Sequence, residues 1–155
     1  MDKPGAIECQ LCPEGQYQNN SKQKECFKCH PGTYQNQTGQ EKCEPCEIGH
    51  YIEQPGSMGC LPCNEGEFQN VTGQSNCSKC LPGTFQNKTG QSECLSCGNG
   101  TFSSKPGSLN CEFCPKGQFQ NETGQSKCLP CIHGTYQNVT GKSSCIPCPL
   151  GHYCK

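Results

Sequence analysis

The sequence predicts a small disulfide-rich fold, mostly turns and short β segments, extended into a solenoid-like rod of 17-residue repeats. Three observations lead to this class: an unbroken period of cysteine pairs, a high content of Cys (19), Gly (19) and Pro (12), and no 3.6-residue hydrophobic period. Only 30% of the residues are hydrophobic, and many of those are cysteines. Such a chain cannot build a large apolar core, so covalent cross-links must hold it.

The repeat unit has a fixed internal pattern. A glycine stands three residues after the second cysteine of each pair and an aromatic residue two residues later, as in Gly32 and Tyr34. Most units continue Gln-Asn-x-Thr-Gly, whose glycine suits a turn with positive φ; the first unit has Lys22 there. We expect each unit to contact only its neighbours, with its aromatic residue covering a disulfide. The Cys-x-x-Cys pairs begin at Cys9, Cys26, Cys43, Cys60, Cys77, Cys94, Cys111, Cys128 and Cys145.

A longer period of 51 residues lies over the first, because the third and sixth units carry proline-containing segments at 53–57 and 104–108 in place of Asn-x-Thr-Gly. We therefore divide the chain into the end of a preceding repeat (1–8), eight complete repeats (9–144) and the start of a ninth (145–155). Residues 2–6 align with 104–108, and no signal-peptide core follows Met1. We expect a segment of a longer array, with a true start at Met1 as the alternative.

The cysteine spacing leaves two connectivities to weigh. A bridge within Cys-x-x-Cys closes a strained loop. A bridge from the second cysteine of one unit to the first of the next closes a loop of about 15 residues, worth roughly 3 kcal/mol in the chain-entropy model. We favour the longer closure.

The sequence Cys-Pro-Glu-Gly-Gln-Tyr at 12–17, with the next pair Cys26 and Cys29 and the Gly-Thr-Tyr at 32–34, resembles the cysteine-rich modules of ephrin receptors and tumour-necrosis-factor receptors. The resemblance covers all nine units and extends to large extracellular proteins of protists and algae. It implies an elongated, ladder-like extracellular architecture, and no ligand-contact motif of those receptors is matched. The implied bridges are Cys12–Cys26, Cys29–Cys43, Cys46–Cys60, Cys63–Cys77, Cys80–Cys94, Cys97–Cys111, Cys114–Cys128 and Cys131–Cys145. Cys9, Cys148 and Cys154 would find partners outside the segment, and for Cys154 a neighbouring chain is a further option.

Zinc is the alternative explanation for repeated Cys-x-x-Cys pairs. We expect no metal or other cofactor, because zinc ribbons need no glycine and aromatic residue in every interval. Asp2 is the only aspartate, which rules out a calcium loop of the Asp-x-Asp type, and no Ser/His/Asp or Cys/His set indicates an enzyme. The histidines share no spacing and suit solvated turns: His30, His50, His133 and His152.

The composition also limits compartment and partners. A cysteine density this high is typical of oxidising compartments, which indicates a secreted protein at the cell surface or beyond. The net charge of -1 with only 16% charged residues argues against a nucleic-acid partner. No apolar run approaches the ~20 residues of a membrane span.

N-glycosylation sequons recur at one position of the repeat, immediately after the glutamine. They are missing at the equivalent residues Glu53 and Ser104 of the third and sixth units, which we call third-type units. We therefore expect N-linked glycans. Asn76 and Asn99 also head sequons but adjoin a framework cysteine and glycine, so they are weaker candidates. The six candidates are Asn19, Asn36, Asn70, Asn87, Asn121 and Asn138.

If successive units rotate by about a third of a turn, the sugar-free third-type units align on one side of the rod. That side would be a bare apolar stripe suited to packing against another copy or a partner. The sequence thus favours a structural glycoprotein, a segment of an extracellular filament or cell-surface appendage that self-associates into a fibre or packs laterally. A receptor or adhesion stalk that binds a protein ligand is the alternative. The expected packing stripe comprises Tyr51, Ile52, Pro55, Met58, Phe102, Pro106, Leu109 and Tyr153.

Overall fold

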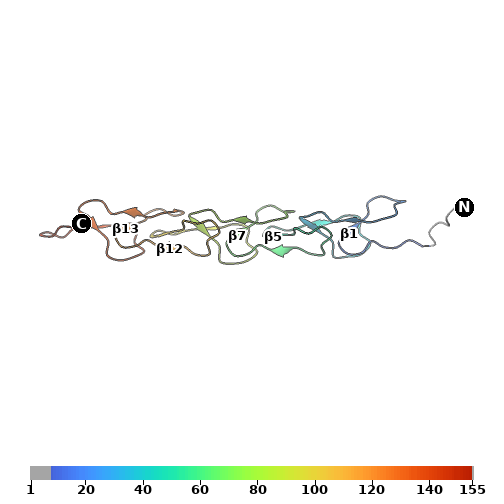
Figure 1. Cartoon of the computed structure of the whole chain (residues 1–155), viewed down its shortest axis with the longest axis horizontal. Coiled ribbons are helices and arrows are strands. Elements are labelled where there is room, and N and C mark those ends of the chain that lie inside the picture. The colour runs from blue at the N-terminus through green and yellow to red at the C-terminus, as the bar shows by residue number, and fades with distance from the viewer. Residues whose placement is uncertain (1–7, 155) are drawn as a thin grey trace.

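The computed structural model describes residues 8–154, so the expectations for residues 1–7 and 155 lie outside the described residues. The described part of the molecule is elongated, with its first and last hairpins at opposite ends of the long axis (Figure 1). Residues 8–154 form 16 strands of two residues each and no helix. Extended pairs and turns therefore make up the whole of the described fold, as the glycine and proline content predicts.

Each repeat contributes one antiparallel hairpin. The first strand contains the aromatic residue and the second contains the two residues between the cysteines of the next pair, so that Tyr17 lies opposite Phe27. The first strands are β1 (Gln16–Tyr17), β3 (Thr33–Tyr34), β5 (His50–Tyr51), β7 (Glu67–Phe68), β9 (Thr84–Phe85), β11 (Thr101–Phe102), β13 (Gln118–Phe119) and β15 (Thr135–Tyr136). Their partners are β2 (Phe27–Lys28), β4 (Glu44–Pro45), β6 (Leu61–Pro62), β8 (Ser78–Lys79), β10 (Leu95–Ser96), β12 (Glu112–Phe113), β14 (Leu129–Pro130) and β16 (Ile146–Pro147).

A disulfide braces every hairpin by joining the cysteine four residues before its first strand to the cysteine immediately before its second strand, at a sequence separation of 14 residues and, in Cys12–Cys26, a Cα–Cα distance of 5.7 Å. These are the eight bridges that the resemblance implies. Two-residue strands cannot hold a hairpin together in water, so the bridge supplies the missing stability. The pairs are Cys12–Cys26, Cys29–Cys43, Cys46–Cys60, Cys63–Cys77, Cys80–Cys94, Cys97–Cys111, Cys114–Cys128 and Cys131–Cys145.

The buried interior is a line of sulfur and amide groups instead of an apolar core. The second cysteine of the interior pairs is fully buried, as at Cys29 and Cys80. The residue that follows the aromatic is also buried in most units. These inward residues are Gln35, Ile52, Gln69, Gln86, Ser103, Gln120 and Gln137.

Backbone hydrogen bonds join each unit to the next. The amide of Gly83 donates to the carbonyl of Ser103 (2.7 Å), and the amide of Gly90 donates to the carbonyl of Cys63 in the preceding unit (2.8 Å). Gly83 also faces the carbonyl of Gly124 in the next unit but one, so closely that an added Cβ would lie 2.1 Å from that oxygen. The expectation that a unit contacts only its neighbours is therefore wrong: the turns reach one unit further because glycine lets two backbones meet.

The turn glycines have positive φ, as predicted, for example 69° at Gly39 and 76° at Gly56. Lys22, which takes the glycine's place in the first unit, has a φ of 63° and is the one non-glycine residue of positive φ within 8–154. The turn thus keeps its conformation when the glycine is replaced.

One pairing expectation is wrong. Cys148 and Cys154 bond to each other across six residues, instead of waiting for partners outside the segment. The reason is that Cys154 follows the aromatic position, whose successor points inward in the preceding units, so its sulfur lies within reach of Cys148. Cys9 is unpaired and exposed.

Candidate functional site

The repeated turn after the aromatic residue is organised by the inward glutamine. The side chain of Gln35 donates to the carbonyl of Lys42 (2.8 Å) and accepts from the amide of Gln37 (3.0 Å). Both ends of the amide are satisfied, which is why a polar side chain can be buried here. The same pair of bonds forms at Gln18, Gln69, Gln86, Gln120 and Gln137.

The sequon asparagines stand next to these glutamines. Because the glutamine points inward, the following asparagine points away from the rod, and its turn lies at the surface. Asn76 and Asn99 are exposed too, but they do not follow an inward glutamine. The structure brings the six predicted asparagines to equivalent, exposed places: Asn19, Asn36, Asn70, Asn87, Asn121 and Asn138.

The third-type turns are held differently. In the sixth unit the hydroxyl of Ser103 bonds to that of Ser108 (2.7 Å), which donates to the carbonyl of Lys105 (2.8 Å). In the third unit Ile52 is buried, and the hydroxyl of Ser57 donates to the carbonyl of Gln54 (2.7 Å). Loss of the glutamine and loss of the sequon therefore coincide in the same two units.

The predicted stripe is only partly at the surface. Ile52 is 8% exposed, so its assignment to a bare stripe is wrong: it takes the inward position that glutamine fills elsewhere. Tyr51 and Phe102 are half-buried. The exposed members are Pro55, Met58, Pro106, Leu109 and Tyr153.

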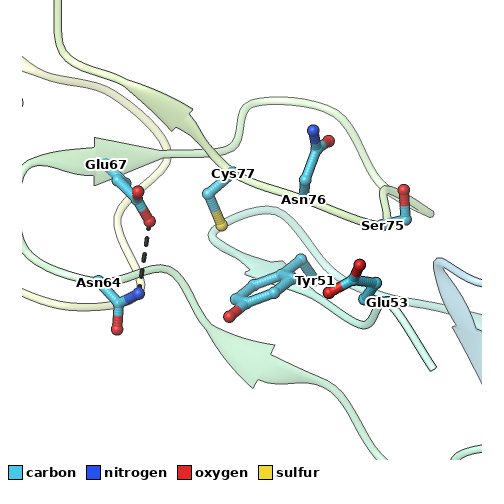
Figure 2. Close-up of a pocket in the computed structure, with 7 residues that line it drawn as sticks. All are labelled: Tyr51, Glu53, Asn64, Glu67, Ser75, Asn76 and Cys77. Carbon is cyan, nitrogen blue, oxygen red and sulfur yellow. Dashed lines mark hydrogen bonds between the residues drawn. The ribbon is translucent and has the colours of Figure 1, made fainter.

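An open hollow beside the third unit is lined by the aromatic residue of that unit and by a disulfide-bonded cysteine of the next hairpin. Tyr51 lies beside Cys77, whose disulfide with Cys63 belongs to the following hairpin (Figure 2). Across the hollow the side-chain amide of Asn64 lies 3.5 Å from the carboxylate of Glu67. The arrangement is open to solvent and presents hydrogen-bonding groups beside a disulfide.

A zinc site would use the cysteines of the Cys-x-x-Cys pairs. From Cys12 to Cys148, these cysteines are bonded in disulfides. Between residues 8 and 154, no three His, Cys, Asp or Glu side chains are grouped so that they could hold a metal ion. The same residues contain no helix with the length and apolar character to cross a membrane.

Sequence reasoning identified the asparagines and missed the glutamines. A signal was present, since glutamine recurs at one position of the repeat wherever a sequon follows. What the pattern did not show is the direction in which that side chain points.

Known proteins similar to this chain include a solved structure and a family of repeats. Among solved structures, a chain of the human RANKL/OPG complex is similar at 22% identity, over 85% of this chain and 95% of that one, with a TM-score of 0.26. No curated protein matches. The profile of the family described as tyrosine-protein kinase ephrin type A/B receptor-like matches residues 3–39, 20–59, 32–73, 49–90, 66–110, 100–133 and 121–155. The chain therefore belongs to the ephrin-receptor-like family of cysteine-rich repeats, the non-catalytic modules of extracellular domains.

Proposed function

We propose that this chain is a structural glycoprotein segment, a rod of an extracellular filament or cell-surface appendage. The observation that carries the proposal is the uniformity of the inter-unit contacts. The amides of Gly32, Gly66 and Gly100 each donate to the next unit at 2.7 Å, with no loop of different length between them. A rod whose units are joined by the same repeated hydrogen bond suits a mechanical or spacing role.

The surface supports the same role. The sequons lie on exposed turns, and the third-type turns leave Met58 and Leu109 exposed without a sequon beside them. Sugars on the other turns would keep those sides solvated, while the third-type side packs against a second rod. N-linked glycans and lateral self-association are thus parts of the proposal.

A receptor or adhesion stalk is the second candidate, favoured by membership of the ephrin-receptor-like family. A stalk would use the same rigid frame to hold a binding surface away from the membrane. Ligand-reading modules usually carry loops of individual length and sequence, whereas the bridged cysteines of each hairpin here are always 14 residues apart.

The test is electron microscopy and sedimentation of the chain secreted from glycosylating cells. The filament proposal predicts rods that associate side by side as concentration rises, with glycans at the six asparagines found by peptide mapping. Single rods at every concentration, with intact glycans, would contradict it and favour the stalk.

A further inference from the structure

The hollow beside the third unit is acidic. Glu53, which stands where other units have the sequon asparagine, lines one part of the hollow, and Glu67 lines another. In the view of Figure 2, Tyr51 lies between Glu53 and the pair formed by Asn64 and Glu67. Two carboxylates therefore flank a half-buried aromatic ring at a turn that carries no sequon.

The sixth unit builds the same turn. The amide of Ser103 donates to the carbonyl of Gln125 (3.2 Å), as the amide of Ile52 donates to the carbonyl of Gln74 in the third unit (3.3 Å). These bonds join residues at equivalent positions, 51 residues apart in the sequence. The two third-type turns therefore share one backbone arrangement, and their side chains can be compared position by position.

The sixth unit is basic where the third is acidic. Lys127 holds the position of Asn76, and Lys105 follows Ser104, which is the equivalent of Glu53. Both lysines are exposed. Glutamine takes the place of the second carboxylate. The two turns without a sequon thus present opposite charges on similar surfaces.

A lysine lies against each of these turns and does not account for the difference. An added Cβ on Gly56 would lie 3.3 Å from the side chain of Lys28, and one on Gly107 would lie 3.5 Å from that of Lys79. The alkyl stems of these lysines cover the turns of both units in the same way. The difference in charge comes from the residues in and beside the hollows.

The charges of the two turns are not used within the rod. Among residues 8–154 the one ion pair joins Lys42 to Glu44, at 3.2 Å. Glu53 and Lys105 are exposed and are therefore free to meet charges on another molecule. Exposed ion pairs add little affinity, whereas like charges brought together across a contact are costly, so charge decides which faces can meet.

We propose that two copies of this chain pack side by side in opposite directions, with the third unit of each rod against the sixth unit of the other. This pairing rests on the proposed filament role and gives its lateral contact a register and a direction. A two-fold axis relates the rods, so Glu53 of each copy faces Lys105 of the other. Met58 and Leu109, exposed in the same two turns, supply the apolar part of the contact.

Other arrangements leave charges opposed or unmatched. Parallel rods without a stagger place the acidic turn on the acidic turn and the basic turn on the basic turn. Parallel rods shifted by three units match one turn of each rod and leave the other for a third rod, which gives open-ended growth. The two-fold arrangement matches both turns within a single pair of rods.

The test is sedimentation of the glycosylated 155-residue protein at low ionic strength. We expect a pair of rods as the first associated species, and Glu53→Lys or Lys105→Glu should weaken its formation by about tenfold or more. The matched controls are Glu122→Lys and Lys88→Glu, which reverse exposed charges on sequon-bearing turns and keep the sequons. Both controls should associate like the unaltered chain.

Mixing the variants tests the register. Glu53→Lys and Lys105→Glu in equal amounts should recover the association that each loses alone, because both contacts then join unlike charges. The double variant with both changes should associate by itself. In the unaltered chain, carbodiimide coupling should join Glu53 of one rod to Lys105 of the other.

Single variants that associate as strongly as their controls would overturn the pairing, and so would open-ended growth without a pair of rods as an intermediate. If association ignores these reversals but is lost in Met58→Lys with Leu109→Lys, the lateral contact stands and this register is wrong. If the unaltered chain stays as single rods at every concentration, the filament role and the pairing both fail.

Discussion

At the scale of single residues, stability depends on a buried amide with both ends satisfied. Gln86 is 3% exposed, donates to the carbonyl of Glu93 (2.9 Å) and accepts from the amide of Lys88 (3.1 Å). Gln86→Ala leaves both backbone groups unpaired, and we expect a local loss of about 1–3 kcal/mol. Hydrogen exchange should show faster exchange of the Lys88 amide. Glu93→Ala, an exposed change in the same hairpin, should leave that amide protected; equal effects of the two variants would contradict this role.

The close approach of glycine backbones gives a second residue-scale prediction. Gly83→Ala carries the cost of an L-residue at a φ of 88°, roughly 1–2 kcal/mol, and adds a clash with the carbonyl of Gly124. Gly117→Ala has a φ of 79°, but its added Cβ meets nothing within 4 Å among residues 8–154. Denaturant unfolding of the monomers should therefore show the larger loss for Gly83→Ala. Equal midpoints would mean that the contact between alternate units contributes nothing.

The residue scale is also where sequence reasoning stopped. The period showed that Ile52, Ser103 and Cys154 are equivalent, but a period says nothing about inside and outside. Ile52 belongs to the predicted stripe because its unit lacks a sequon, whereas its side chain is buried. The sequence did not predict that this position points inward, because it usually holds glutamine and polar residues are usually exposed.

At the scale of the hairpin, the disulfide is the stabilising element, since the strands are two residues long. Replacing both Cys80 and Cys94 by serine opens a loop worth about 3 kcal/mol in the chain-entropy model. We expect exchange protection to fall across residues 80–94 and to remain in distant hairpins, because contacts reach only one and two units away. Cys9→Ser removes an exposed, unpaired thiol and serves as the control. Unfolding of the entire rod on loss of one bridge would contradict this local picture.

The bridges could be predicted because the spacing and the family resemblance agree on one connectivity. The pairing of Cys148 with Cys154 could not, since it depends on where one side chain points at the end of the ladder. The contact between alternate units could not be predicted either. A repeat pattern defines the units, but it does not show how far along the rod each turn extends.

At the scale of the whole molecule, lateral packing should depend on the third-type units and not on apolar surface in general. Met58 and Leu109 are 59% and 43% exposed in those units, while Val71 and Val139 are 51% and 48% exposed on sequon-bearing turns. Burying each such side chain in a contact is worth up to about 3 kcal/mol, so lysine at both third-type positions should abolish side-by-side association.

The double variant Val71→Lys with Val139→Lys is the matched control, since it adds the same charge and keeps both sequons intact. In sedimentation of glycosylated protein, Met58→Lys with Leu109→Lys should remain as single rods at concentrations where the control associates. If both double variants associate like the unaltered chain, the third-type side is not the contact. If only the control dissociates, the packing surface lies on the turns that bear the sequons, and the sugars cannot be the solvent-facing side.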